Sequence, residues 1–588
     1  MRQAGSIKSL SDLLCGLLLL LLLQSCGGGS SGSNEPLPPP LPPPPPVGSR
    51  DQLTVDELLG QVGPGVVHND YFQPRGDLAP VSNVLCGTIH VAETQMDTTH
   101  FDVDWRGGGH TLFPAFSLPV AIDGDWLIPL ERDLILSGHG AGPGQSVWNI
   151  ILNPGQVWQE ADDAAYSRAA FPFTLTDNYV GQARNGLATF VFNAAGVSSL
   201  AIQITQETAP VSEHDRTNFS ALVAVTWDPT CPLEANALVA EFVDERAARL
   251  PVRPWSDLPD AAATQATSRS GFADTDLSMV ALLMDGELFV QDVATRSGPH
   301  PWPEWMRHGV FSVTKTIGNG VAMFYLAQRY GDSIFDELIT DYVPGLANHP
   351  GWQNVTFHHT LNMMTGTTGA ERGNLIGPFI LSRSAAAKIA AIEAFADAPA
   401  APGAEFAYYS IHSFVLSYAM NNFVQAREGP GANYWEMVKE DVLEPIGIPY
   451  LPISRSIEAA GAPGIPIMGW GSYPDVDAAA KIAQLLQDDG VFQGQQLLSL
   501  VKTREAMRRT SVPDYPTGHS SERYLHSVWT VRTNTGSCTI DVPLMSGAGG
   551  NHVMMLPSGL SVIRFMDADD YEVSQTVRAV EGYRSSCM

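Results

Sequence analysis

Two residues whose types suit covalent chemistry lie one helical turn apart in the second half of the chain. Ser312 and Lys315 fall within HGVFSVTKTIGNGVAMFYLAQRYGD (308–332), and the 588 residues include only six lysines. Apolar spacing predicts a helix over 313–330 that Gly331 ends. Residues three apart share a helix face, so a lysine whose charge is disfavoured by burial can take the serine proton. The pair therefore predicts a serine nucleophile.

The Ser-x-x-Lys spacing alone is a weak signal, because the chain contains it twice. The second copy, Ser499 with Lys502, lies in SLVKTREAMRR, which is typical of a solvated helix. Another imitation, GGSSG at 28–32, has the spacing of a nucleophile elbow. Neither imitation follows a predicted strand or lies beside other reactive residues, so we favour Ser312.

Three stretches around and after Ser312 carry a family resemblance. VFSVTKTIGNG, DYVPGLANHPGWQNVTFHHTLNMMTG and PGAEFAYYS together resemble the penicillin-binding and class C β-lactamase-like serine hydrolase family, in its branch of esterases and 6-aminohexanoate-dimer hydrolases. The resemblance implies an acyl-enzyme on Ser312, with Lys315 as its base. The family's Tyr-x-Asn motif falls on Tyr408 and Ser410 as Tyr-x-Ser, and Tyr409 is an alternative one residue away.

The family's third motif, Lys-Thr-Gly or His-x-Gly on a strand beside the nucleophile, is less clear. In PLMSGAGGNHVMMLPSGLSVIRF the third motif matches Met545-Ser546-Gly547, give or take two residues along the chain. None of these three residues carries a positive charge. Since a cation at this motif helps to hold a substrate carboxylate, the departure argues against a β-lactamase or carboxypeptidase. The backbone N–H of Ala548, beyond Gly547, is our candidate to form an oxyanion hole with that of Ser312. A plain glycine turn is the alternative.

The resemblance also implies the fold of the second half, 256–588. We expect an α/β fold in which an antiparallel sheet is flanked by helices and a helical subdomain lines the cleft. Members of the family need no metal or cofactor. Four histidines nearby lack convincing ligand spacing, and we expect structural or peripheral roles for them: His358, His359, His412 and His552.

The first half, 51–255, is expected to form a β-rich module of unknown role. Gly, Pro, Asn and Asp clusters separate its strand-like runs, which are VLCGTIHV, DWLIPLERDLIL, SVWNIILN, LATFVFN, LAIQIT and ALVAVTW. We find no nucleophile or metal constellation in this half. A helix is predicted over 234–250 and a linker over 250–271, and Asp285-Gly286 predicts a hairpin.

The first 25 residues have the pattern of a bacterial lipoprotein signal peptide. Arg2 and Lys8 precede an apolar run, 17–23, that is too short to span a bilayer. The text LLLQSC is similar to a lipobox, in which Cys26 would carry the lipid and begin the mature chain. A plain signal peptide with an incidental cysteine is the alternative.

A Gly/Ser-rich and Pro-rich linker follows over 26–50. As polyproline II, 36–46 would reach roughly 34 Å at about 3.1 Å per residue, which suits a tether between a membrane and a folded body. Gly27 after the cysteine, rather than Asp, favours the outer membrane. The predicted location is therefore the bacterial cell envelope, with a lipid anchor as the membrane contact.

Four cysteines remain beyond the signal peptide and the lipobox. An even number in an exported chain favours disulfides, and free buried thiols are the alternative. We expect pairing within each half, Cys86 with Cys231 and Cys538 with Cys587.

Composition narrows the classes of partner. The formal net charge is −29 and the pI about 4.7, which argues against nucleic acid, since phosphate binding needs basic patches. Two functional hypotheses remain. The first is a lipid-anchored serine hydrolase acting on a small-molecule or peptide-like ester or amide. The second is a binding or scaffold lipoprotein of reduced catalytic activity, whose β-rich half carries the function. The sequence leaves the oligomeric state open.

Overall fold

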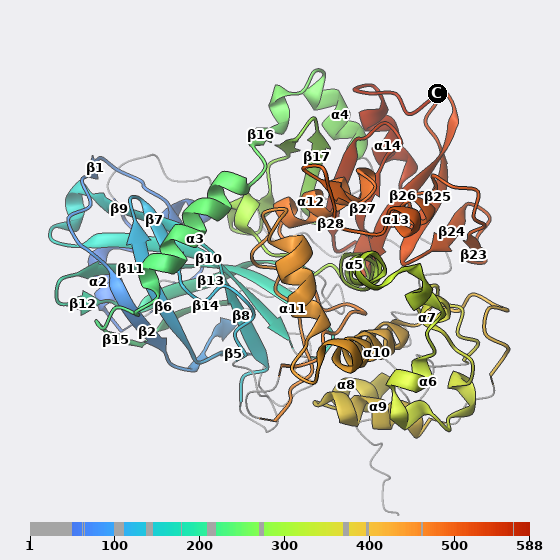
Figure 1. Ribbon diagram of the computed structural model, residues 1–588. Coiled ribbons are helices and arrows are strands. Elements are labelled where there is room, and N and C mark those ends of the chain that lie inside the picture. Colours follow the sequence, from blue (N-terminus) through green and yellow to red (C-terminus); the bar gives the residue numbers. More distant parts are fainter. Residues whose placement is uncertain are drawn as a thin grey trace, which may run out of the picture.

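The computed structural model describes residues 50–587, except 62, 64, 99–110, 137–144, 178, 209–218, 270–275, 368–375, 396–398, 460–462 and 569. The predicted signal peptide, Cys26 and nearly all of the linker lie outside the described residues, so their assignments stay predictions. Two large sheets dominate the molecule, one in each half of the chain, on the left and upper right of Figure 1.

The first sheet is antiparallel throughout and closes on itself. Its order is β15 (Val225–Asp228), β2 (Cys86–Val91), β6 (Phe116–Asp123), β7 (Trp126–Pro129), β9 (Gly155–Glu160), β10 (Ser167–Asp177), β11 (Ala183–Asn193), β13 (Leu200–Thr208), β14 (Phe219–Val223) and β4 (Asp97–Thr98). Three strands pair beside this path, β1 (Leu78–Ala79), β8 (Trp148–Leu152) and β12 (Gly196–Val197). β14 and β15 are successive parts of one extended segment. Since β14 pairs with β13 and β15 pairs with β2, this segment joins the two ends of the sheet. The expected β-rich module is a closed sheet.

Side chains bury both faces of this sheet, as the two-residue period of strands requires. On β11, Ala188 and Phe190 pack into an apolar cluster inside the closed sheet, which we call the interior cluster. Leu187 and Val191 pack into a second cluster on its outer face, the exterior cluster. The exterior cluster includes Leu58 of α2 (Val55–Leu59) and Phe242 of α3 (Ala235–Ala248), so these helices cover the outside. The helix predicted over 234–250 is therefore confirmed as α3.

The second sheet has nine strands in the order β16 (Val252–Pro254), β18 (Glu287–Val290), β17 (Leu277–Met284), β28 (Ser561–Met566), β27 (Asn551–Met555), β26 (Thr539–Gly547), β25 (Val528–Asn534), β24 (Glu522–Leu525) and β23 (Tyr515–Pro516). All pairs are antiparallel except β16 with β18. One face packs against α5 (Val321–Tyr330) and α12 (Val476–Gln487), and the other against α4 (Ala261–Ser268) and α14 (Ser574–Glu581). The hairpin at Asp285-Gly286 is confirmed, with φ of 54° and 79°.

A set of helices forms a subdomain that extends from the centre to the lower right of Figure 1. It contains α6 (Ile339–Tyr342), α7 (Phe357–Leu361), α8 (Ile376–Leu381), α9 (Ala385–Glu393), α10 (Ser410–Glu428) and α11 (Tyr434–Val438). An antiparallel sheet with helices on both faces and a helical subdomain is the expected fold, which is confirmed. No helix within the described ranges is long and apolar enough to cross a bilayer.

The predicted linker over 250–271 is wrong. This segment contains β16, a 3-10 turn (Trp255–Asp257) and α4, which packs against α14. Trp255 is only 2 % exposed and Leu258 4 %, so scattered apolar residues anchor a stretch whose Pro and Asp content is typical of loops. Because β16 pairs with β18, residues 252–254 belong to the second sheet.

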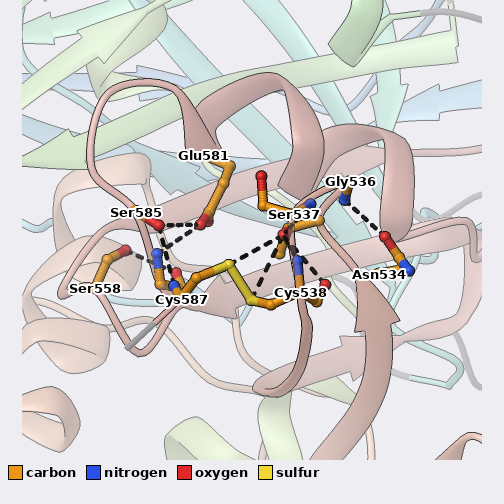
Figure 2. Close-up of a disulfide and its surroundings, with 10 residues drawn as sticks. Asn534, Gly536, Ser537, Cys538, Ser558, Glu581, Ser585 and Cys587 are labelled. Atoms are coloured by element: carbon orange, nitrogen blue, oxygen red, sulfur yellow. Dashed lines mark hydrogen bonds between the residues drawn. A yellow bond between two sulfur atoms is a disulfide. The ribbon is translucent and has the colours of Figure 1, made fainter.

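Both expected disulfides are confirmed. Cys86 pairs with Cys231 within the β-rich half, and Cys538 pairs with Cys587 within the second half, with Cα–Cα distances of 5.0 and 5.9 Å. Figure 2 shows the second bond, which fastens the end of the chain beside the start of β26, close to Ser558 and Glu581.

Candidate active site

Ser312 lies on the turn that enters the nucleophile helix. Phe311 before it has a φ of +45°, a left-handed conformation that is uncommon for a bulky residue. The helix starts at Val313, continues as a π-helical turn over Lys315–Gly320 and then as α5, and Gly331 ends it with a φ of 93°. The predicted bounds of 313–330 are confirmed, although the π-helical turn was not predicted.

The side-chain nitrogen of Lys315 is the centre of the site. Its Nζ lies 2.7 Å from Ser312 Oγ, 2.9 Å from Ser410 Oγ and 3.0 Å from the carbonyl oxygen of Gly469. The side chain is 1 % exposed, and all three of these oxygens are uncharged. The serine hydroxyl thus lies within hydrogen-bond reach of the lysine nitrogen, which is the geometry that proton transfer between the two groups requires.

Tyr408 closes one side of the lysine. Lys315 Nζ lies 4.5 Å from the centroid of its ring, and the ring packs against Trp529 at 5.3 Å. Tyr409 instead packs against the His412 ring at 5.2 Å. The structure thus brings Tyr408 and Ser410 to Lys315, which favours the Tyr408 register over the alternative at Tyr409.

The end of β26 lies against the turn that carries the nucleophile. A Cβ placed on Gly547 would come within 2.1 Å of Val310 O and 3.0 Å of Ser312 N, so only glycine fits there. Ala548 follows and is exposed, whereas Met545 is fully buried in the core. The register proposed for the third motif therefore faces the nucleophile, and its first residue offers no charge to the site.

One part of the site escaped the sequence analysis. The loop of residues 469–472 supplies the carbonyl of Gly469 to Lys315, and Ser472 Oγ lies 2.8 Å from Thr314 Oγ1. A Cβ on Gly469 would lie 2.8 Å from Ser410 O, which requires glycine. In the amino-acid sequence only the glycines on either side of Trp470 mark this loop. The group that contacts Lys315 is a backbone carbonyl, which every residue has.

The second Ser-x-x-Lys match is not assembled into a site. Ser499 caps α13 (Leu500–Ala506) and donates to Asp332 at 2.7 Å, while Lys502 Nζ pairs with Glu505 at 3.0 Å. Both side chains are thus engaged in structural contacts.

The four singled-out histidines are held within the protein. Burial lowers the pKa of each of them, to about 3 for His412 and about 4 for His358. His412 Nε2 lies 2.8 Å from Thr367 Oγ1, and His552 Nδ1 lies 3.0 Å from a nitrogen of Arg564. In the part of the chain that the structure describes, no group of three or more His, Cys, Asp or Glu side chains is placed to hold a metal ion.

No family model and no curated protein matches this chain. Among solved structures it is similar to a penicillin-binding protein homolog from Caulobacter crescentus, at 18 % identity over 55 % of this chain and 97 % of that one, with a TM-score of 0.40. It is also similar to a D-stereospecific amidohydrolase from Streptomyces sp., at 17 % identity over 55 % of this chain and 98 % of that one, with a TM-score of 0.38. A family VIII carboxylesterase is similar at 18 % identity over 58 % of this chain and 96 % of that one, with a TM-score of 0.40. The chain is thus similar to each of these proteins over somewhat more than half of its own length and nearly all of theirs.

Proposed function

We propose that this protein is a serine hydrolase that cleaves an ester or amide bond through an acyl-enzyme on Ser312. The observation that carries the proposal is the 2.7 Å contact between Ser312 Oγ and Lys315 Nζ, within a buried set of uncharged oxygens. Catalysis by a serine needs a base within hydrogen-bond reach of its hydroxyl.

In the first step, neutral Lys315 accepts the hydroxyl proton and Ser312 Oγ bonds to the carbonyl carbon. The carbonyl oxygen gains negative charge, which the N–H groups of Ser312 and Ala548 would receive; the close approach of Gly547 to Ser312 N supports this assignment. Fixed donors of this kind stabilise the tetrahedral intermediate without reorganisation.

In the second step, the protonated lysine returns its proton to the leaving group as the bond to that group breaks. Ser410 Oγ, 2.9 Å from Lys315 Nζ, offers a hydroxyl group for this transfer, and the ring of Tyr408 faces the same nitrogen. A water molecule then attacks the acyl carbon with Lys315 as base, releasing the acid and restoring the Ser312 hydroxyl.

The proposed substrates are neutral, small-molecule or peptide-like esters and amides. A desolvated carboxylate needs a matching cation, and the third-motif position offers Met545, which lies in the core. We therefore expect a higher kcat/KM for p-nitrophenyl butyrate than for a chromogenic cephalosporin. The opposite order would show that a cation elsewhere receives the carboxylate.

We also propose that lipidated Cys26 anchors the protein in the bacterial cell envelope, on the outer membrane. The support is the signal-like sequence of 1–25 and the proline-rich linker that follows. Replacing Cys26 by serine should move the protein from the membrane to the soluble fraction; unchanged membrane association would refute the anchor.

Labelling by a fluorophosphonate tests the proposed activity most directly. We expect mass spectrometry to find the adduct on the peptide that contains Ser312, and Ser312→Ala to lose both labelling and ester hydrolysis. Ser499→Ala is the matched control, because that serine has the same spacing to a lysine but caps a helix. A wild-type protein that neither labels nor hydrolyses esters would favour the binding or scaffold hypothesis.

A further inference from the structure

We infer that the β-rich module is a structural part of the active site, and that Thr208 and the turn between β10 and β11 hold the catalytic groups in position. The inference builds on the proposed function and assigns a role to the first half of the chain. Two separate contacts carry it, one to the segment before Ser312 and one to the loop that binds Lys315.

The first contact fixes the approach to the nucleophile. Gly309, three residues before Ser312, donates its N–H to Thr208 Oγ1 at the end of β13, at a distance of 2.8 Å. Arg307, two residues earlier, donates from Nε to Asn153 Oδ1 of the module at 3.2 Å. These bonds are buried, so they are strengthened by a low local dielectric. They hold the segment in which Phe311 adopts its left-handed conformation.

The second contact starts from a rigid turn. Asp177 Oδ1 accepts the N–H groups of Tyr179, Val180 and Gly181 at 2.8, 2.8 and 3.2 Å. Asp177 is fully buried. Val180 belongs to the same apolar cluster as Ile317 of the nucleophile helix, so the turn is inserted into the core of the hydrolase half.

This turn presses on the loop that serves the lysine. A Cβ on Gly181 would lie 2.9 Å from both the carbonyl oxygen and the Cδ1 atom of Trp470. The residue before Trp470 is Gly469, whose carbonyl accepts the hydrogen bond from Lys315. Further along the loop, Tyr473 packs in a small cluster with Ile151 and Ala183 of the module. The module therefore sets the position of the loop relative to Lys315.

Small displacements at such contacts have large effects on rate. A misplacement of about 1 Å at a catalytic group can cost roughly a hundredfold. Thr208 and Gly181 touch neither substrate nor Ser312, so they act as positioning residues. Losing them should lower kcat more than it raises KM.

Three threonine variants test the first contact. Thr208→Val removes the acceptor of the Gly309 N–H, and Thr208→Ser retains it. Thr189→Val is the matched control, because Thr189 is equally buried and its hydroxyl bonds only within the module, to Ala169 O at 2.9 Å. We expect Thr208→Val to lower kcat about tenfold or more, with KM within twofold of wild type. Thr208→Ser should recover most of the rate, and Thr189→Val should keep it.

Hydrogen exchange without substrate gives a readout independent of activity. In Thr208→Val and in Gly181→Ala, we expect faster exchange in peptides covering 309–316 and 467–473, and unchanged exchange there in Thr189→Val. Unchanged exchange and unchanged kcat in both variants would overturn the inference while leaving the proposed function intact. Equal loss of kcat in Thr208→Val and Thr189→Val would also overturn it, since both would then reflect general destabilisation. If wild type shows no hydrolysis, exchange alone decides the positioning role, and only the proposed function fails.

Discussion

The buried lysine is held by three oxygens that play different parts. In the proposed reaction Ser312 Oγ is the partner in proton transfer and Ser410 Oγ is a hydroxyl that can relay a proton, whereas the carbonyl of Gly469 can only accept. A carbonyl acceptor aims one N–H of Lys315 away from the serine. The remaining directions of the nitrogen are thereby left for the two hydroxyl groups.

Replacing Lys315 by arginine should nearly abolish acylation. Arginine stays protonated in proteins and cannot serve as a base, and its planar group does not fit three acceptors spaced around a point charge. We expect the burst of p-nitrophenol from a nitrophenyl ester to slow by more than a hundredfold. Retention of more than a tenth of the wild-type rate, a change of under about 1.4 kcal/mol, would show that only the positive charge matters.

Adding a methyl group at Gly547 should impair catalysis by displacing the nucleophile turn. The new Cβ would clash with Val310 O at 2.1 Å and crowd Ser312 N. We expect Gly547→Ala to lower kcat by roughly 10²-fold, the size of effect seen when an oxyanion donor is lost. Gly582→Ala is the control, since a Cβ there meets open space at an ordinary φ of −66°. Equal kinetics in the two variants would remove Gly547 from the site.

At the level of residues, the sequence predicted the candidate groups that carry reactive side chains. Ser312, Lys315, Tyr408 and Ser410 were identified by type and spacing, and the structure brings them together. Gly469 was missed because its carbonyl carries no side-chain chemistry to recognise, and its distance of more than 150 residues from Lys315 is closed only by the tertiary fold.

Whether a helix or strand was predicted depended on how clearly its apolar and polar residues follow a regular spacing. The nucleophile helix and the hairpin at Asp285-Gly286 were predicted because apolar spacing and turn residues agree there. Strand β10, SRAAFPFTLTD, was missed because all of its residues are buried, so no polar face marks the period, and Pro172 lies within it. The π-helical turn at Lys315–Gly320 could not be predicted either, since its residues are compatible with an ordinary helix.

The disulfide at the end of the chain should affect stability more than catalysis. It ties Cys538, just before β26, to Cys587 across 49 residues, and the chain-entropy account gives roughly 4 kcal/mol for a loop of this size. We expect the double variant Cys538→Ser/Cys587→Ser to unfold at lower urea concentration than wild type, while kcat for a nitrophenyl ester stays within twofold. A fall in kcat without a shift in the urea midpoint would contradict this assignment.

Across the whole molecule, buried neutral histidines should make the protein sensitive to acid. Burial lowers the pKa of His300, His308 and His412 to about 3, whereas an unfolded chain binds these protons near pH 6.5. The unfolded state therefore holds more protons between these values, and stability falls as the pH drops from about 6.5 toward 3.

His308 allows this acid sensitivity to be measured. Its ring packs on Phe565 at 5.0 Å, and neither ring nitrogen has a hydrogen-bond partner among the described residues. His308→Phe should reduce the slope of unfolding free energy against pH by about 1.4 kcal/mol per unit between pH 4 and 5.5. Urea titrations at several pH values would measure it, and an unchanged slope would mean that His308 is already protonated in the folded protein.

The topology of the second sheet has a consequence for the order in which the two halves of the protein fold. Every strand pair of the β-rich module lies within residues 78–228, so its sheet can form without any strand of the other half. In the other half, β17 pairs with β28, joining Leu277 to Met566, and the strand that meets Ser312 ends at Gly547. The sheet beside Ser312 therefore cannot close until strands more than two hundred residues further along the chain are available. The β-rich module can thus precede the hydrolase half in folding, and we expect Ser312 to become reactive only after the last strands have paired.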